Sequence, residues 1–313
     1  MRALVTGCSG FIGSHLSERL LDSDWSVVGI DSLSPTYDTI GRRRNLEAVA
    51  KRPNFEFIEG DLNMIDLSHH VGETDVVFHL AARPGVRASW RDFAQASNAN
   101  ILATQRVLDA LVETGSSRLV FASSSSVYGQ AETFPVSEEV RLAPISPYGV
   151  TKAACEALLS AYTSQFPLTA TSLRYFTVYG PRQRSDMAFT RWIGAALRGD
   201  PIRVYGDGSA IRDFTYVGDV VEATIVAAHQ VETGHHVYNV AGGEPATLLD
   251  VFDMIGKSTG RQLNLKHEER ALGDPLRTGG DTTRIEAELG WKAGTPLSTG
   301  IEAQVEWYRS AHG

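Results

Sequence analysis

The chain has 313 residues, a net charge of −8 and a pI near 5.6. Hydrophobic residues make up 42% of it and charged residues 21%, which is typical of a globular enzyme with one large and one smaller domain. The acidic balance argues against a nucleic-acid partner, and no run of about 18 apolar residues could span a membrane. Its two cysteines, Cys8 and Cys155, predict neither a disulfide framework nor a metal site. The first residues form a strand pattern instead of a signal peptide, which predicts a cytoplasmic protein.

Short apolar runs alternate with helical patterns through the first half of the chain. The runs predict strands at 3–6, 26–31, 55–59, 75–80, 118–123 and 169–175. The patterns between them predict helices at 12–21, 94–114 and 148–165. Continuous apolar strands alternating with helices predict an α/β fold, a Rossmann-like doubly wound parallel sheet covered on both faces.

The regular alternation of strand and helix patterns ends after residue 175. Beyond it, glycine-rich turns separate helical patterns at 190–198, 217–230, 248–258 and 300–309. This pattern predicts a smaller C-terminal α+β domain that closes over the carboxyl edge of the sheet. We therefore divide the chain into a large domain with the Rossmann-like sheet, 1–175, and a smaller domain, 176–313. Part of 211–240 is expected to return to the first domain.

A glycine-rich turn joins the first strand to the first helix, in the sequence GCSGFIG at residues 7–13. Gly7 permits the tight turn, Gly10 lets the backbone approach a pyrophosphate, and Gly13 lets the helix pack closely on the strand. Phe11 and Ile12 begin the helix, whose free N–H groups and dipole favour phosphate. The spacing predicts a dinucleotide site, although this turn alone is a weak signal.

Asp31 ends the second strand, 18 residues after Gly13. A carboxylate there can accept both hydroxyls of an adenosine ribose and repel a 2′-phosphate, which favours NAD over NADP. The basic run at 42–44 could argue for NADP, but it lies well past the strand end. We interpret it as a solvated helix face.

Two further strand ends carry residues suited to the same cofactor. Asp61 and Leu62 follow the third strand and could meet the adenine. Leu80, Ala81 and Ala82 end the fourth strand, where small side chains let a cofactor lie close. Their position at successive carboxyl ends of parallel strands is what a doubly wound site requires.

Tyr148 and Lys152 are four residues apart at the start of a predicted helix and so share one face. A nearby ammonium stabilises a phenolate, so the tyrosine could take a proton from a sugar hydroxyl while hydride leaves the same carbon. The strand before this helix ends in serines at 123–126, which places hydroxyls at the ligand edge of the sheet.

Together these segments resemble the extended short-chain dehydrogenase/reductase family over essentially the whole chain. The matching motifs are GCSGFIG, HLAA, NILAT, SSSSVYG, YGVTK, RYFTVYGP and RDFTYVGD. The resemblance implies bound NAD, a nucleotide-sugar substrate, and a homodimer through helices near 94–114 and 148–165. It implies Tyr148 as the base, Lys152 as its partner and Ser124 as the hydroxyl that shares the reacting oxygen. Asn100, in NILAT, takes a cofactor-site position that could be purely structural.

Finer details resemble the UDP-glucuronate 4-epimerases. Related dehydratases and decarboxylases carry acidic residues just before V-Y-G, where this chain has Ser125 and Ser126. Thr177 replaces the family's usual asparagine, and Arg184 opens the segment RSDMA. Arg87 lies in a further matching segment, RPGVRAS. These residues could bind a C6 carboxylate, although Arg184 could also be a surface arginine.

The UDP half of the substrate is expected in the smaller domain. Tyr205 resembles the aromatic residue that stacks on uracil, Arg212 resembles the diphosphate contact, and Arg270 is a second candidate for that contact. Three alternatives stay open: a UDP-glucose 4-epimerase, a UDP-glucuronate decarboxylase, and a non-catalytic NAD-binding protein of the same fold.

Overall fold

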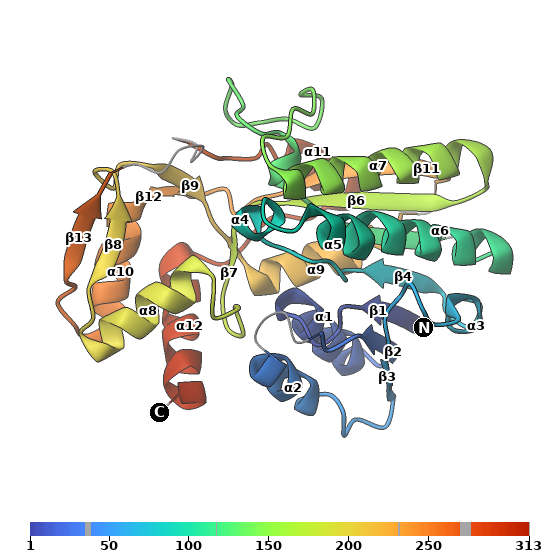
Figure 1. Cartoon of the computed structure of the whole chain (residues 1–313), viewed down its shortest axis with the longest axis horizontal. Coiled ribbons are helices and arrows are strands. Elements are labelled where there is room, and N and C mark those ends of the chain that lie inside the picture. The colour runs from blue at the N-terminus through green and yellow to red at the C-terminus, as the bar shows by residue number, and fades with distance from the viewer. Residues whose placement is uncertain (35–38, 117, 231, 270–276, 313) are drawn as a thin grey trace.

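The computed structural model describes residues 1–34, 39–116, 118–230, 232–269 and 277–312. Its centre is a seven-stranded parallel sheet in the order β11-β6-β5-β4-β1-β2-β3 (Figure 1). From β1 the chain adds β2 and β3 toward one edge of the sheet, and it then crosses back to add β4, β5 and β6 on the other side of β1. The strand order therefore reverses between β1 and β4. Ligands of open α/β sheets bind at such a reversal. The strands are β1 (Arg2–Thr6), β2 (Ser26–Asp31), β3 (Phe55–Glu59), β4 (Val76–His79), β5 (Arg118–Ser124), β6 (Thr169–Tyr175) and β11 (Gly234–Val240).

Helices cover both faces of this sheet. One face packs against α1 (Phe11–Asp22), α9 (Val217–Ala227) and α11 (Thr283–Leu289), and the other against α3 (Leu67–Val71), α6 (Ala103–Thr114) and α7 (Pro147–Gln165). In β1, Ala3 and Val5 belong to the first core and Leu4 to the second, and all three are fully buried. Burial on both faces explains why the strands are continuous apolar runs, and it confirms the predicted fold class.

The helix predicted at 94–114 is interrupted. It consists of α5 (Phe93–Ser97), a π-helical turn at Asn98–Leu102 and then α6. A π-turn inserts one residue and so displaces the apolar pattern by one position, a shift too small for periodicity to divide the segment into two helices.

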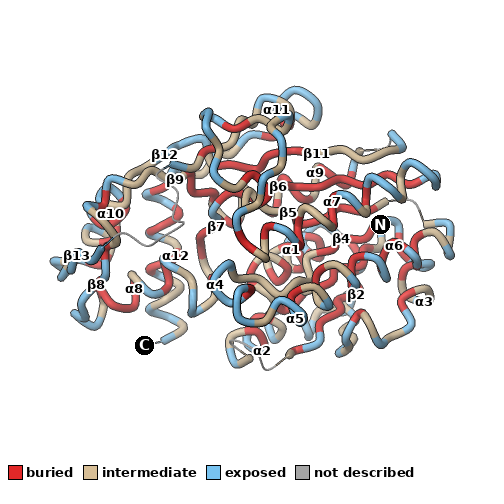
Figure 2. The backbone as a smooth tube through the Cα atoms, turned by 45° about the horizontal axis from the view of Figure 1, so that its top comes forward, coloured by how far each residue is buried: buried red, intermediate tan, exposed pale blue. Residues whose placement is uncertain are grey.

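A third hydrophobic core lies among three helices, α8 (Ala188–Arg198), α10 (Leu248–Thr259) and α12 (Leu297–His312). Figure 2 shows these buried segments apart from those of the large sheet. Short paired strands complete this part: β7 (Val178–Tyr179) with β10 (Thr215–Tyr216), β8 (Ile202–Tyr205) with β13 (Leu265–Glu268), and β9 (Ile211–Asp213) with β12 (Pro245–Thr247).

The chain returns to the large sheet after leaving it at β6. Helix α9 packs on that sheet, and β11 pairs with β6 along its whole length, from Gly234 beside Thr169 to Val240 beside Tyr175. The division of the chain near residue 175 stays a prediction. Within the described residues, no helix is long and apolar enough to cross a membrane.

Candidate active site

Two cavities lie beside the carboxyl ends of the strands. The first, which we call the sheet-edge cavity, has a volume of about 530 Å³. Eight predicted cofactor residues line it: Gly7, Gly10, Asp31, Asp61, Leu62, Leu80, Ala81 and Ala82. The second, the arginine cavity, has a volume of about 1160 Å³ and lies mainly against the smaller part of the chain. Arg83 lines both cavities.

The glycine turn is tightly packed. Gly7 has a φ of +73°, and a Cβ added to it would lie 2.8 Å from the backbone nitrogen of Ala81. A Cβ on Gly13 would lie 2.1 Å from the Gly7 carbonyl oxygen. Phe11 is buried in the core and Ile12 packs against it, so their side chains point away from the cavity. These two residues can meet a ligand through backbone N–H groups.

Asp31 accepts four hydrogen bonds. Its Oδ2 accepts from the backbone nitrogen of Ser9 at 3.2 Å and from the Ser9 hydroxyl at 2.5 Å, and its Oδ1 accepts from the Leu33 nitrogen at 3.0 Å. The fourth donor is the Arg42 guanidinium, which forms an ion pair with Oδ1. Both side chains are buried.

The interpretation of residues 42–44 as a solvated face is therefore wrong for Arg42. It lies on α2 (Thr39–Glu47), whose first turn folds back toward the end of β2, and its Nη1 donates to the Ser34 carbonyl at 3.0 Å. Its neighbours Arg43 and Arg44 are exposed. Arg42 lies well past the end of β2 in the sequence, which is why the sequence alone predicts a solvated side chain. Its long side chain nevertheless reaches back from α2 to Asp31.

Asn100 does not line the sheet-edge cavity. Its Oδ1 accepts from the Arg83 nitrogen at 2.7 Å, and its Nδ2 donates to the Arg83 carbonyl at 3.3 Å and to the Thr151 hydroxyl at 2.9 Å. Asn100 is buried in the π-helical turn. It therefore holds the backbone of a residue that borders both cavities, which is a positioning role.

Helix α7 begins with a strong start signal and carries the predicted Tyr148 and Lys152 in its first turns. The Ser146 hydroxyl accepts from the Gly149 nitrogen at 3.1 Å, and Pro147 occupies the first helical position. A Cβ on Gly149 would lie 2.5 Å from the Ser126 carbonyl oxygen. The missing side chain thus lets α7 pack against the serines that end β5.

Contacts on either side fix the first turns of α7. The Tyr148 nitrogen donates to the hydroxyl of Ser89, which ends α4 (Val86–Ser89), at 3.0 Å. The Lys152 ammonium is buried and donates to the Ala122 carbonyl of β5 at 2.6 Å. Burial disfavours its charge and lowers the pKa of Lys152 to about 8.

The three serines begin at the end of β5 and continue into a short 3₁₀ turn, η2 (Ser125–Val127). The Ser124 hydroxyl accepts from the Ser126 nitrogen at 3.1 Å. The same hydroxyl also carries one hydrogen, which it can donate to a ligand oxygen. Ser124, Ser125 and Ser126 are each half-buried.

The arginine cavity concentrates positive charge in an acidic protein. Its described lining contains eight arginines and two aspartates, Asp186 and Asp200, whereas the whole chain has a net charge of −8. Such a concentration attracts anionic ligands. Sequence reasoning identified three of these arginines as substrate residues and did not single out the other five, although Arg83 lies in the segment RPGVRAS. The five are Arg83, Arg91, Arg191, Arg198 and Arg203.

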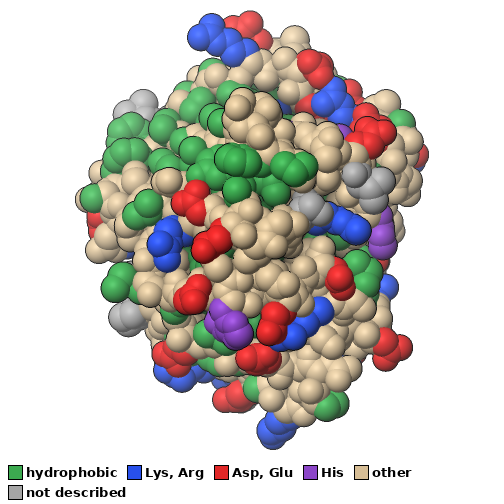
Figure 3. Space-filling view, turned by 90° about the vertical axis from the view of Figure 1, so that its right-hand side faces the viewer, with side chains coloured by type: hydrophobic (Ala, Val, Ile, Leu, Met, Phe, Trp, Pro, Cys, Tyr) green, Lys and Arg blue, Asp and Glu red, His purple; other side chains and the backbone are tan. Residues whose placement is uncertain are grey.

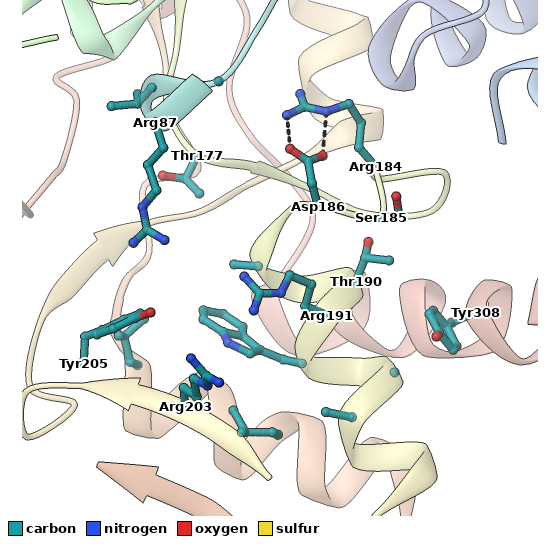
Figure 4. Close-up of a pocket in the computed structure, with 18 of the residues that line it drawn as sticks. Arg87, Thr177, Arg184, Ser185, Asp186, Thr190, Arg191, Arg203, Tyr205 and Tyr308 are labelled. Carbon is teal, nitrogen blue, oxygen red and sulfur yellow. Dashed lines mark hydrogen bonds and ion pairs between the residues drawn. The ribbon is translucent and has the colours of Figure 1, made fainter. Parts of the chain in front are cut away.

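Five predicted substrate residues line this cavity: Arg87, Thr177, Arg184, Tyr205 and Arg212. In Figure 4, Arg87 extends from α4 toward Tyr205, and its guanidinium carbon lies 5.7 Å from the centre of the tyrosine ring. Arg212 donates to the Ile211 carbonyl at 2.9 Å. Arg184 forms two hydrogen bonds with Asp186, which Figure 4 shows as dashed lines. Arg270 lies outside the described residues.

This combination of a doubly wound sheet, a glycine turn and a tyrosine–lysine helix defines a family. The model of the NAD dependent epimerase/dehydratase family matches residues 3–241, and the chain belongs to that family. The resemblance to extended short-chain dehydrogenases/reductases is thereby confirmed, with NAD as the cofactor.

Relatives at full length narrow the comparison. The chain is 40% identical to the uncharacterized UDP-glucose epimerase YtcB of Bacillus subtilis, covering 100% of this chain and 99% of that protein. It is 32% identical to a UDP-glucuronate 4-epimerase of Thermodesulfobacterium geofontis, over 97% and 95%. It is also similar to the crystal structure of the Bacillus cereus UDP-glucuronic acid 4-epimerase in complex with UDP-glucuronic acid and NAD, with a TM-score of 0.94, 38% identity and full coverage of both chains.

Proposed function

We propose that the protein interconverts UDP-glucuronic acid and UDP-galacturonic acid by inverting C4 of the sugar. The observation that carries this proposal is the arginine cavity, where Arg184 and Thr177 offer carboxylate donors among arginines suited to a diphosphate. The relatives of full length whose names include UDP-glucuronate 4-epimerase support the same substrate.

The sheet-edge cavity fits a dinucleotide. Among the described residues, no side chain caps the start of α1, so its first N–H groups are available to a pyrophosphate. The Asp31 carboxylate lies where an adenosine ribose would bind, and Ala81 and Ala82 leave room beside β4. NAD, when bound, supplies a reversible acceptor for the hydride of the sugar carbon.

Tyr148 acts as the base in this proposal. Its phenolic oxygen removes the proton of the C4 hydroxyl as that carbon is oxidised. It returns a proton to the same oxygen after the 4-keto sugar has rotated and accepted hydride on its other face. The Lys152 ammonium favours the phenolate, and the Ser124 hydroxyl donates to the reacting oxygen. The contacts of α7 with Ser89 and Ala122 support these roles, because they fix the helix beside the end of β5.

A uronic acid places a special demand on the site. Its 4-keto form is a β-keto acid and loses CO₂ when the carboxyl bond aligns with the ketone π-system. We assign Arg184, Thr177, Ser125 and Ser126 to hold the carboxylate out of that alignment. No carboxylate stands at 125 or 126 to act as an additional acid or base, which favours epimerisation over decarboxylation.

Arg184→Ala is expected to lower kcat/KM for UDP-glucuronic acid about 10- to 100-fold, the value of a charge-assisted bidentate contact. It should also raise the fraction of product that has lost CO₂, because the carboxylate is free to rotate. Mass spectrometry of the products measures both effects. Release of no more CO₂ or UDP-pentose than by the wild type would contradict the carboxylate assignment.

The pH dependence should report Lys152. Its lowered pKa of about 8 means that the ammonium loses its proton as pH rises through that value. The phenolate of Tyr148 then loses its stabilising charge, so kcat should fall above about pH 8. Lys152→Met should be slower at every pH and lack this decline. A wild-type profile that stays level from pH 7 to 10 would count against the assignment.

The direct test incubates the purified protein with UDP-glucuronic acid, with and without added NAD. A product of unchanged mass that co-elutes with UDP-galacturonic acid supports the proposal. A product lighter by CO₂ indicates a decarboxylase, and conversion of UDP-glucose alone indicates a neutral-sugar epimerase. No reaction with either sugar, despite bound NAD, would indicate the non-catalytic alternative.

Further substrate contacts belong to the same proposal. Tyr205 would stack on the uracil, with Arg212 and Arg270 on the diphosphate and Arg87 beside them. The residues at 176–313 would form the UDP-binding domain. Replacing Tyr205 with alanine should weaken binding of UDP itself, and unchanged UDP affinity would oppose the stacking role.

We also propose a homodimer in the cytoplasm. Exposed apolar side chains lie on and near α5 and α7, with Trp90 68%, Phe93 46% and Val150 42% exposed, and they border a hollow of about 410 Å³. Figure 3 shows a broad hydrophobic area on the side of the molecule where α6 and α7 end. Pairing of two copies would cover such a surface. Sedimentation at twice the chain mass of 34.0 kDa supports the dimer, and a monomer opposes it.

A further inference from the structure

Arg184 and Asp186 form a bidentate ion pair in the wall of the arginine cavity. Arg184 Nε lies 2.9 Å from Asp186 Oδ1, and Arg184 Nη2 lies 3.0 Å from Oδ2. Two parallel N–H···O bonds of this kind are the geometry in which an arginine binds any carboxylate. Asp186 therefore presents to Arg184 the same chemical group that a uronic acid would bring.

We propose that Asp186 is a specificity-determining residue, an internal carboxylate that competes with the substrate carboxylate for Arg184. This inference rests on the proposed function, because it assigns Arg184 to the C6 carboxylate. A uronic acid can use the Nε–Nη2 edge of Arg184 only by replacing Asp186. A neutral sugar requires no such exchange and leaves the pair intact.

The two partners differ in how readily they can move. The Asp186 side chain is 57% exposed, whereas that of Arg184 is 18% exposed. A displaced Asp186 could thus turn into water and stay hydrated. Arg184 would remain in the cavity wall and exchange one carboxylate for another, so the charge around its guanidinium would be preserved.

The backbone around the pair is anchored, so the exchange involves side chains. On one side, Arg182 forms an ion pair with Glu18 at 2.7 Å. Next to it, buried Gln183 donates to the Val178 carbonyl at 3.0 Å and accepts from the Thr190 nitrogen at 3.1 Å and from Gln304 Nε2 at 3.1 Å. These bonds hold the loop between β7 and α8 in place.

A second pair in the same cavity serves as a matched control. Arg198 and Asp200 are also two residues apart, and Arg198 Nε lies 2.8 Å from Asp200 Oδ2. Both residues line the arginine cavity. Removing the Asp200 charge changes the overall charge of the cavity as much as removing that of Asp186, but it leaves Arg184 paired.

The test compares Asp186→Asn and Asp186→Ala with Asp200→Asn in the holoenzyme. Binding of UDP-glucuronic acid and UDP-glucose is measured by calorimetry in a Tyr148→Phe background, and KM is measured in the active enzyme. The Asp186 variants should bind UDP-glucuronic acid about 3- to 10-fold more tightly than the parent, which is the scale of a partly exposed ion pair. Their affinity for UDP-glucose should change by less than about twofold. Asp200→Asn should change both affinities by the same factor.

Two results would overturn the inference. An equal gain for both sugars would show a general charge effect, and weaker binding of UDP-glucuronic acid in the Asp186 variants would show that Asp186 supports Arg184 instead of competing. Failure of the proposed function looks different, since the active enzyme would then not epimerise UDP-glucuronic acid. The ratio of the two sugar affinities would still decide the role of Asp186 in that case.

Discussion

Replacing Tyr148 by phenylalanine is expected to lower kcat for C4 epimerisation about 10²- to 10⁴-fold, the usual contribution of a general base. The substitution removes one hydroxyl and keeps the ring. It should leave the start of α7 intact, because the backbone nitrogen of Tyr148, which the substitution keeps, donates to the Ser89 hydroxyl. Affinities for NAD and for the UDP-sugar should therefore stay within a few-fold of wild type. Initial rates and calorimetry measure the two sides of this expectation.

Tyr162 provides the matched control for this change. It lies on the same helix, and its hydroxyl donates to Asp109 at the protein surface, away from both cavities. Tyr162→Phe should keep the rate close to that of the wild type. If Tyr148→Phe retained more than about a tenth of the wild-type rate, another group would have to be the base.

Arg174→Met is expected to lower the free energy of unfolding by about 3–5 kcal/mol, the cost of leaving a buried charge without its partner. Arg174 on β6 and Glu156 on α7 are buried, and Arg174 Nη2 lies 2.7 Å from Glu156 Oε2. Arg174 also donates to the Tyr128 hydroxyl at 2.8 Å, and the Ser123 hydroxyl donates to Glu156 at 2.5 Å. Urea unfolding measures the loss.

Two controls separate burial from charge. Arg52→Met breaks an exposed pair with Asp22, at 2.9 Å, and should cost less than about 1 kcal/mol. Removing both buried charges, with Arg174→Met and Glu156→Leu together, should recover part of the lost stability. A loss for Arg174→Met no larger than that for Arg52→Met would show that water reaches Glu156. Since Glu156 lies one turn after Lys152, the pair also ties the catalytic helix to the sheet.

The sequence predicted the large sheet well because its signals are local. Each of the six predicted strands is a short apolar run, and all six differ from the observed bounds by no more than one residue at either end. The cavity-lining glycines, Gly7 and Gly10, were also predictable, since a turn at a strand–helix junction demands them.

Features that depend on side-chain reach were not predictable. Arg42 lies 11 positions after Asp31 and meets it only because α2 folds back. The pairing of Arg184 with Asp186 depends on the turn between them, and RSDMA as a motif indicated Arg184 alone. Asn100 matched a motif, but its partner Arg83 is known only from the fold. Of the predicted site residues, the roles at Tyr148, Lys152 and Ser124 stay predictions supported by position.

The ion pair between Asp31 and Arg42 changes how cofactor choice should be understood. The ion pair as a whole carries little net charge, so it repels the 2′-phosphate of NADP only weakly. Selection of NAD then depends on hydrogen-bond donors: a ribose hydroxyl can take the place of one of the donors that Asp31 now has, whereas a phosphate monoester at pH 7 offers almost only acceptors. Salt distinguishes the two explanations. Repulsion would be screened, so preference for NAD over NADP would shrink as ionic strength rises, whereas a preference set by donors and acceptors would persist.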